Sequence, residues 1–280
     1  MTMKNEFWRL TIDTNPEDCN LACIMCEEHS PYSDFKERLF AKTGKKVRRM
    51  PSEWLEPIFQ DAKALGIREI IPSTMGEPLL YKDFDQILAL CQKYALKCNL
   101  TTNGTFPKRT VEDWASRIVP VTSDVKISWN GATAQISEEV MLKIDFEQAI
   151  ENVRTFIKYR DAHAAAGGNF CRVTFQLTFM RNNMHELAAI IQLAAGLGVD
   201  RVKGHQLWDH FPETKSLGFR QNATTIAEWN GYVSQAVAAA EKYRKPNDEK
   251  VILEQIIPLK EMETQAVPEA YSCPFLGKEL

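Results

Sequence analysis

Short apolar runs alternate with longer helical patterns along most of the chain, and this alternation limits the fold more than any other feature. The runs predict strands over residues 10–13, 68–72, 97–101, 124–129, 172–179 and 201–206. The patterns between and after them predict helices over residues 52–65, 84–94, 111–118, 146–165, 184–197 and 223–243. Strands separated by helices of this length are typical of parallel βαβ units. The chain is therefore expected to be an α/β protein, a partial barrel built from six such units.

The length of the chain and a polar break near its C-terminus suggest two parts. Its 280 residues fit a single α/β barrel with room for a short addition. Residues 246–250 are polar, and no clear helical period follows them. We therefore expect a barrel core over residues 1–245 and a short C-terminal extension over residues 246–280.

Charge and hydropathy exclude several classes of partner. The net charge is −3, so no overall basic field favours nucleic acid or an anionic membrane. The sequence has no apolar run of about 18 residues, the length that a membrane-spanning helix needs. Residues 1–10 do not resemble a secretory signal. A cytoplasmic protein without nucleic-acid or membrane partners is expected.

Cysteine spacing is the strongest chemical signal in the chain. Seven cysteines are present, and this odd number argues against a disulfide framework in a cytoplasmic protein. Cys19, Cys23 and Cys26 fall within eight residues, directly after the first predicted strand. Such close spacing indicates metal or redox chemistry.

Three thiolates on one short loop can hold three irons of a 4Fe–4S cube and leave the fourth iron without a protein ligand. An open coordination position suits a metal site that activates a bound molecule. Two other interpretations stay open. The three residues are core cysteines that act as small hydrophobes, or His29 completes a Cys3His zinc site in a non-catalytic module that binds a partner.

The C-x3-C-x2-C spacing after the first strand resembles the radical S-adenosylmethionine (SAM) superfamily. The resemblance implies that Cys19, Cys23 and Cys26 bind a 4Fe–4S cluster and that SAM chelates the remaining iron. In that family an aromatic residue that packs near the adenine often precedes the last cysteine. Met25 stands at this position and keeps an apolar contact.

The segment after the second strand, residues 73–78, resembles the glycine-glycine-glutamate-proline motif of the family, with Met75 in place of the first glycine. In relatives this motif binds the SAM amino group, and an ammonium needs acceptors such as carbonyls or a carboxylate. The resemblance therefore implies SAM contacts from Gly76, Glu77 and Pro78. An ordinary strand-to-helix turn is the alternative.

The ends of the later strands provide further expected contacts. The third strand is followed by a threonine-asparagine-glycine run, and the fourth ends in a serine that commonly contacts the SAM ribose or carboxylate in relatives. Polar residues on the fifth strand face SAM or substrate, or are satisfied core groups. In relatives the backbone of the sixth strand holds the adenine. These expectations fall on Asn103, Ser128, Gln176 and Lys203, with Thr178, His205 and His210 as further candidates.

The resemblance implies a radical reaction. A reduced cluster cleaves SAM to methionine and a 5′-deoxyadenosyl radical, which abstracts hydrogen from a peptide or small-molecule substrate. The reaction needs a low-potential electron donor such as a flavodoxin or ferredoxin. Basic residues at positions 42–49 are a candidate docking site for such an acidic partner, although a solvated charged loop is the simpler interpretation.

Near the C-terminus, Tyr271-Ser272-Cys273-Pro274-Phe275 resembles the start of a SPASM or Twitch extension, which binds auxiliary clusters through several cysteines. The sequence given has no cysteine after Cys273, so the extension looks incomplete. The subgroup favours an oxidoreductase or maturase that modifies a peptide, a protein or a related metabolite. The alternative is an epimerase or dehydrogenase for a sugar-like metabolite, with Cys273 as hydrogen-atom donor.

Overall fold

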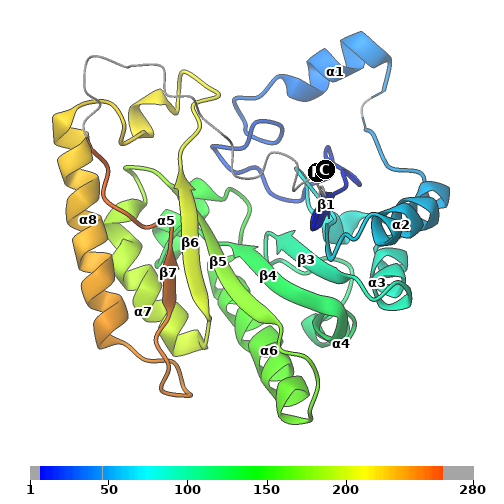
Figure 1. Cartoon of the computed structure of the whole chain (residues 1–280). Helices are drawn as coiled ribbons and strands as arrows, with labels where there is room; N and C mark the ends of the chain where they lie inside the picture. The colour runs from blue at the N-terminus through cyan, green and yellow to red at the C-terminus, as the bar shows by residue number, and fades with distance from the viewer. Residues whose placement is uncertain (1–6, 46, 261–280) are drawn as a thin grey trace, which may run out of the picture.

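A computed structural model of the chain describes residues 7–45 and 47–260. Within these residues one parallel sheet runs in the order β1 to β7, so that each strand pairs with the next along the chain (Figure 1). The strands are β1 (Arg9–Thr11), β2 (Glu69–Ile71), β3 (Lys97–Thr102), β4 (Thr122–Ser128), β5 (Arg172–Phe179), β6 (Arg201–Gln206) and β7 (Ile252–Glu254). The predicted α/β fold with an open, parallel partial barrel is confirmed.

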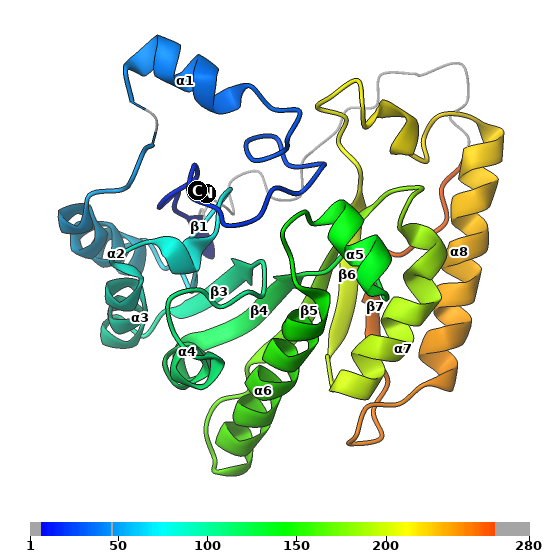
Figure 2. The same cartoon turned by 180° about the vertical axis from the view of Figure 1, so that it is seen from behind.

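Helices connect successive strands, as parallel pairing requires. They are α1 (Phe35–Thr43), α2 (Leu55–Ala64), α3 (Phe84–Lys93), α4 (Val111–Ile118), α5 (Ala134–Val140), α6 (Phe146–Ala165), α7 (Leu187–Leu197) and α8 (Ala223–Lys242). Short 3-10 turns cover Ser52–Trp54, Pro78–Leu80, Val119–Val121, Met184–Glu186 and Lys215–Leu217. Figures 1 and 2 show α3, α4, α6 and α7 on one face of the sheet.

The main core lies between that helical layer and the sheet. Leu100, Ile127 and Phe175 leave the strands toward the helices and are fully buried, as is Phe156 of α6. Side chains of a strand alternate between its two faces, so the residues between these apolar ones face the other way. That second face of the sheet, opposite the helices, carries the polar residues described below, and we call it the cavity face.

Three elements were not predicted. Helix α1 buries none of its residues and therefore lacks the apolar stripe that marks a core-facing helix. Helix α5 has only seven residues. Strand β7 has three residues and forms by pairing with β6, beyond the last strand expected from the sequence. No helix among the described residues is both long and apolar enough to cross a membrane.

Candidate functional site

The loops at the carboxyl ends of the strands surround a cavity of about 400 Å³. This volume lies in the range of small-molecule sites, and this end of a barrel is where such sites form. The cavity wall combines the cysteine loop with polar residues from the ends of β3 to β6. Its predicted members are Cys19, Cys23, Met25, Cys26, His29, Gly76, Asn103, Ser128, Gln176, Thr178, His205 and His210.

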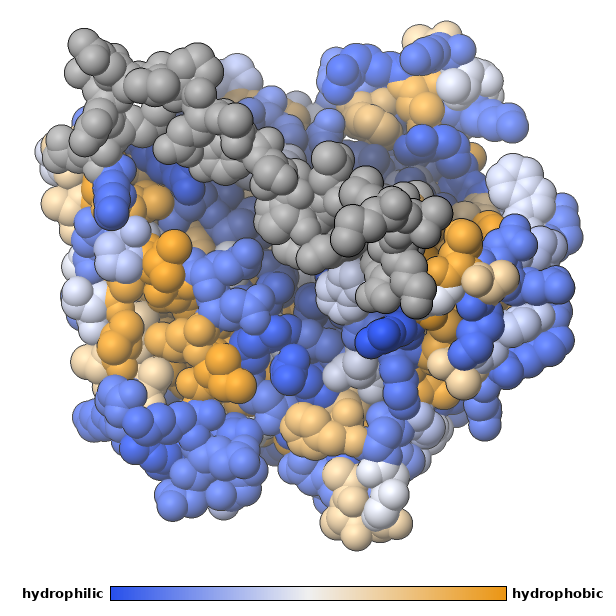
Figure 3. Space-filling view, in the orientation of Figure 1, coloured by the Kyte–Doolittle hydropathy of each residue, from blue (hydrophilic) through white to orange (hydrophobic). Residues whose placement is uncertain are grey.

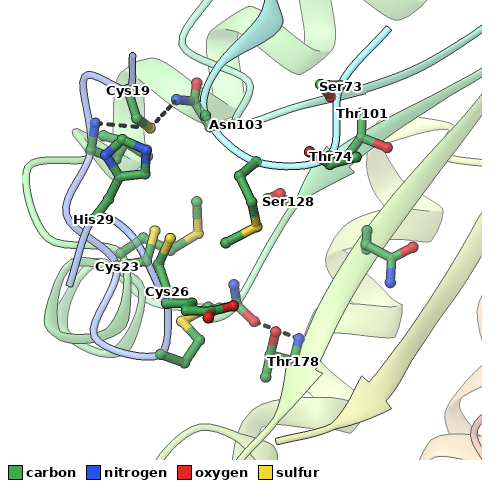
Figure 4. Close-up of a pocket in the computed structure, with 18 of the residues that line it drawn as sticks. Cys19, Cys23, Cys26, His29, Ser73, Thr74, Thr101, Asn103, Ser128 and Thr178 are labelled. Carbon is green, nitrogen blue, oxygen red and sulfur yellow. Dashed lines mark hydrogen bonds between the residues drawn. The ribbon is translucent and has the colours of Figure 1, made fainter. Parts of the chain in front are cut away.

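The cysteine loop follows β1 and is held from two sides. On one side, the backbone N–H groups of Ala22 and Ile24 donate to the carbonyl oxygens of Leu142 and Val140, at 3.1 and 3.0 Å. These bonds tie the loop to the C-terminal end of α5 and to the segment that follows it. Figure 4 shows the side chains of Cys23 and Cys26 next to each other, with Cys19 nearer to Asn103.

On the other side, the loop after β2 lies directly against the cysteine loop. The Glu77 N–H donates to the Asp18 carbonyl at 2.7 Å, and the Asn15 side chain donates to the Glu77 carbonyl at 3.0 Å. Gly76 has φ +75°, and a Cβ there would lie 2.5 Å from the Asn15 oxygen and 2.8 Å from the Asp18 oxygen. Only glycine allows this approach, so Gly76 holds the two loops in register.

Two arginines fasten the basic stretch to the same loop. Arg48 forms an ion pair at 2.5 Å with Glu17, whose side chain is fully buried, and Arg49 pairs with Asp18 at 2.8 Å. The carboxylate of Glu17 also accepts from the Arg48 backbone N–H at 2.6 Å. These two cations therefore position the residues just before Cys19.

The three thiols fit a soft metal cluster. Burial raises the pKa of Cys19 to about 11, and burial also raises the pKa values of Cys23 and Cys26. Repulsion between neighbouring thiolates adds to the effect. Three partly buried thiolates in one wall are therefore costly unless a cation neutralises them, and thiolates are the usual ligands of iron–sulfur clusters.

The zinc alternative needs His29 beside these thiols. The ring does line the cavity, and its Nε2 donates to the carbonyl oxygen of Pro16 at 2.8 Å. Among the described residues, no group of three or more His, Cys, Asp or Glu side chains is close enough to hold a single metal ion.

The carboxylate of Glu77 lies outside the cavity wall, so the expected contact of this motif with the SAM amino group stays a prediction for its backbone. It is fully buried and accepts from the N–H of Asn103 at 2.7 Å, the N–H of Leu79 at 3.2 Å and the hydroxyl of Thr102 at 2.8 Å. Burial raises its pKa to about 7, although these hydrogen bonds oppose the shift. The side chain therefore joins the β2 loop to the end of β3.

Two other expected contacts also lie outside the wall. Pro78 is buried at the start of a 3-10 turn. The ammonium of Lys203 points to Glu254 of β7, at 3.1 Å. Neither residue lines the cavity. The expected adenine contact at Lys203 comes from the strand backbone and stays a prediction.

Asn103 and Ser128 are placed as expected, at the ends of β3 and β4. The amide nitrogen of Asn103 donates to the Asn20 side chain at 2.9 Å and lies 3.8 Å from the sulfur of Cys19. Asn130 also lines the cavity, where its side-chain oxygen accepts from the Thr178 N–H at 2.9 Å. These contacts join the ends of neighbouring strands around the cavity.

Sequence reasoning did not assign several other wall residues. The apolar ones come from the cysteine loop, the motif after β2, the end of α5 and the segment after β6. They are Leu21, Met75, Met141, Leu207 and Trp208. Ser73, Thr74 and Thr101 stand at strand ends, which is the signal that would have found them.

The remaining cysteines lie apart from the site. Cys91, Cys98 and Cys171 are buried in the core. Cys273, the candidate hydrogen-atom donor, lies outside the described residues, and so do its neighbours in the SPASM-like or Twitch-like segment.

The chain is similar to known proteins over much of its length. The model of the Radical SAM superfamily matches residues 16–194, which is more than half of the chain. Probable GTP 3′,8-cyclases of Pyrococcus abyssi and Pyrococcus horikoshii are 32% identical to it over 89 residues, 32% of this chain. The chain spans about a quarter of the length of these two curated relatives.

Solved structures share the fold at low sequence identity. The AdoMet-bound anSMEcpe superposes with a TM-score of 0.63 at 16% identity, over 88% of this chain and 64% of that one. SuiB of Streptococcus suis gives a TM-score of 0.62 at 16% identity, over 90% of this chain and 50% of that one. Methylornithine synthase gives a TM-score of 0.56 at 12% identity, over 95% of this chain and 77% of that one.

Proposed function

The chain belongs to the radical SAM superfamily, and from this premise we propose that Cys19, Cys23 and Cys26 hold a 4Fe–4S cluster at which SAM binds. The observation that carries the proposal is that all three cysteines line one cavity together with the ends of β3, β4 and β5. The chemistry supplied by the bound cluster and SAM is reductive cleavage to methionine and a 5′-deoxyadenosyl radical, which abstracts hydrogen from a substrate.

The chain's own residues bind and orient the two groups. The three cysteines must lose their protons to act as ligands, so cluster binding releases protons. Ser128 and Gln176 present a hydroxyl and an amide that can both donate and accept, as the polar groups of SAM require. The backbone of the β2 loop at Gly76 stays available for the SAM ammonium, although the Glu77 carboxylate does not.

The apolar part of the wall excludes water from the reacting atoms. Met25, Met75 and Met141 line the cavity beside the cysteines. Thioether side chains are flexible and adapt their packing to a ligand. A dry cavity protects a reactive radical from unwanted proton and hydrogen donors.

The substrate that we propose is a peptide or a small molecule, and the reaction class is that of an oxidoreductase or maturase. Two proteins of the same fold support a peptide: SuiB has been solved with the precursor peptide SuiA, and anSMEcpe with AdoMet and the Kp18Cys peptide. The curated relatives are probable GTP 3′,8-cyclases, which favours a small molecule. The SPASM or Twitch extension and the sugar-epimerase alternative with Cys273 stay predictions.

The electron donor that we propose is a flavodoxin or ferredoxin. Arg48 and Arg49 of the basic stretch pair with Glu17 and Asp18, so the stretch contributes less free positive charge than its sequence suggests. Lys42 and Lys45 are exposed and remain available to an acidic partner.

Anaerobic reconstitution with iron and sulfide tests the proposal. The wild-type chain should take up about four irons and four sulfides and, with SAM and dithionite, form 5′-deoxyadenosine. Alanine in place of Cys19, Cys23 or Cys26 should abolish both the uptake of iron and the formation of 5′-deoxyadenosine. Cys91→Ala is the matched control, because Cys91 is a buried core thiol and should leave iron uptake intact. Zinc in place of iron, lost on His29→Ala, would support the binding-module alternative and contradict the proposal.

A further inference from the structure

A band of charged side chains crosses the cavity face of the sheet below the cavity. Its members come from five of the seven strands and are linked by hydrogen bonds in two groups. Hydrophilic residues gather over the middle of this face (Figure 3). We call these residues the polar band: Arg9, Glu69, Asp124, Lys126, Arg201, Lys203 and Glu254.

Every carboxylate of the polar band has a cationic partner. Glu69 pairs with Arg9 at 3.1 Å, and Asp124 pairs with Arg201. Glu254 pairs with Arg201 at 2.6 Å and with Lys203 at 3.1 Å. The three carboxylates of the polar band therefore form ion pairs with three of its four cations, Arg9, Arg201 and Lys203.

The fourth cation, Lys126, has no carboxylate within ion-pair distance among the residues that the structure describes. Its ammonium makes one hydrogen bond, to the side-chain oxygen of Asn99 at 2.6 Å. The amide nitrogen of Asn99 donates to Glu69 at 3.1 Å, so the neutral amide separates the cation from the nearest acid in that group. The polar band thus carries one positive charge that the protein does not balance.

The strand registers place Lys126 directly below the cavity, although Lys126 is not itself among the residues that line it. In the sheet Lys126 pairs with Thr101 of β3, which lines the cavity, and with Thr174 of β5. Ser128, another cavity residue, lies two residues further along the same face of β4. Two residues of a strand span about 7 Å, a distance that the flexible lysine side chain bridges.

The surroundings of Lys126 disfavour its charged form. Burial lowers its pKa to about 8, and the positive charges of Lys203 and Arg9 add to the effect. The negative charges of Asp124 and Glu69 oppose the shift. A bound anion would restore the balance, because an opposite charge at close range favours the protonated lysine.

We infer that Lys126 binds an anionic group of the substrate, a carboxylate or a phosphate, directly below the cavity. This inference rests on the proposed function, since it assigns the chemical class of the substrate at that site. A substrate anchored there extends from the band toward the cavity wall, which holds the proposed SAM contacts Ser128 and Gln176.

Acylation of lysines by acetic anhydride, read by mass spectrometry on the full-length wild-type chain, tests the inference. Inorganic phosphate and acetate are the probes, and sodium chloride at matched ionic strength is the reference. A bound anion that raises the pKa of Lys126 by about one unit should slow its acylation about tenfold near pH ~7. Lys97, an exposed lysine on the neighbouring strand β3, is the control and should not change.

The two probes distinguish the two sources of the anion. If phosphate slows the acylation of Lys126 at a lower concentration than acetate does, the substrate carries a phosphate. If acetate acts at the lower concentration, the substrate carries a carboxylate. The inference is overturned if an anion slows the acylation of Lys126 and Lys97 equally. It is also overturned if neither anion slows the acylation of Lys126 more than chloride does. A failure of the proposed function would appear separately, as missing iron or missing 5′-deoxyadenosine in the reconstitution.

Variants give a second measurement. Phosphate or acetate, whichever protects Lys126, should raise the thermal midpoint of the wild-type chain above its value in chloride. Lys126→Met should remove this increase, Lys126→Arg should keep it, and Lys97→Met should leave it unchanged. An increase that persists in Lys126→Met contradicts the inference.

Discussion

The α-carbon of Gly76 lies so close to the backbone of Asn15 that an added Cβ would stand 2.5 Å from the Asn15 carbonyl oxygen. Real Cβ atoms do not approach a backbone oxygen this closely, so one of the two loops would have to move. The loop that contains Asn15 continues into Cys19, and the loop that contains Gly76 forms the adjacent wall of the cavity. The position of the first cysteine therefore depends on a glycine 57 residues away in the sequence.

Gly76→Ala should displace the cysteine loop. We expect a loss of roughly 3 kcal/mol or more in the free energy of unfolding, since backbone strain and a steric clash combine. Gly66→Ala is the control, because Gly66 also has a positive φ of +83° but nothing lies within 4 Å of its Cβ position. Gly66→Ala should cost only about 1 kcal/mol. Denaturant unfolding and iron uptake measure the two effects, and equal costs for the two variants would contradict the close-approach argument.

Arg48→Ala should destabilise the cysteine loop through Glu17. The variant leaves a fully buried carboxylate without its cation, and we expect a loss of roughly 2–3 kcal/mol. Arg38→Ala removes an ion pair with Asp34 in which both side chains are largely exposed, so it should cost less than about 0.5 kcal/mol. Denaturant unfolding compares the two. A similar small cost for both would mean that Arg48 does not hold the loop.

Ser128→Ala should weaken SAM binding without unfolding the chain. Loss of one hydrogen bond of ordinary strength reduces affinity about threefold to tenfold. Ser116→Ala is the control, because Ser116 lies exposed on α4 and bonds only to the backbone of its own helix. Calorimetric titration of SAM into reconstituted protein makes the measurement. Unchanged affinity in Ser128→Ala would remove Ser128 from the proposed contacts.

Lys126→Met should stabilise the protein at neutral pH and lose this advantage in alkali. The folded-state pKa of Lys126 is lowered to about 8, below the unfolded value near 10.4. The folded state therefore carries the full cost of the charged lysine below about pH 8, and the cost falls as pH rises to about 10.4. The difference in unfolding free energy between variant and wild type should shrink by on the order of 1–3 kcal/mol across this window.

Denaturant unfolding at several pH values measures that difference. Lys97→Met is again the matched control, because Lys97 is exposed and the variant also removes one lysine. A constant difference for Lys126→Met would show that its ammonium is not disfavoured in the folded state.

Most of the strands and the longer helices could be predicted because their signals are local. Four elements have the predicted bounds: α4, α6, β5 and β6. The cysteine spacing and the polar residues at strand ends are local signals too. Parallel strands bring their carboxyl ends to one edge, which is why those residues could be expected at one site.

The directions of individual side chains could not be predicted in the same way. Glu77 stands in the expected motif, but its carboxylate turns to the N–H of Asn103, which is 26 residues away. Lys203 stands on the expected strand, but its ammonium turns to Glu254 on β7, a strand too short to leave a pattern.

The sequence by itself determined the order of strands and helices, the parallel sheet and the loop that carries three cysteines, because each depends on periodicity or spacing among neighbouring residues. Only the tertiary structure decided which charges are neutralised: Arg48 by Glu17, Lys203 by Glu254, and Lys126 by no carboxylate among the described residues. The physical reason is that charge balance depends on distances between residues far apart in the chain, which strand register and loop packing set.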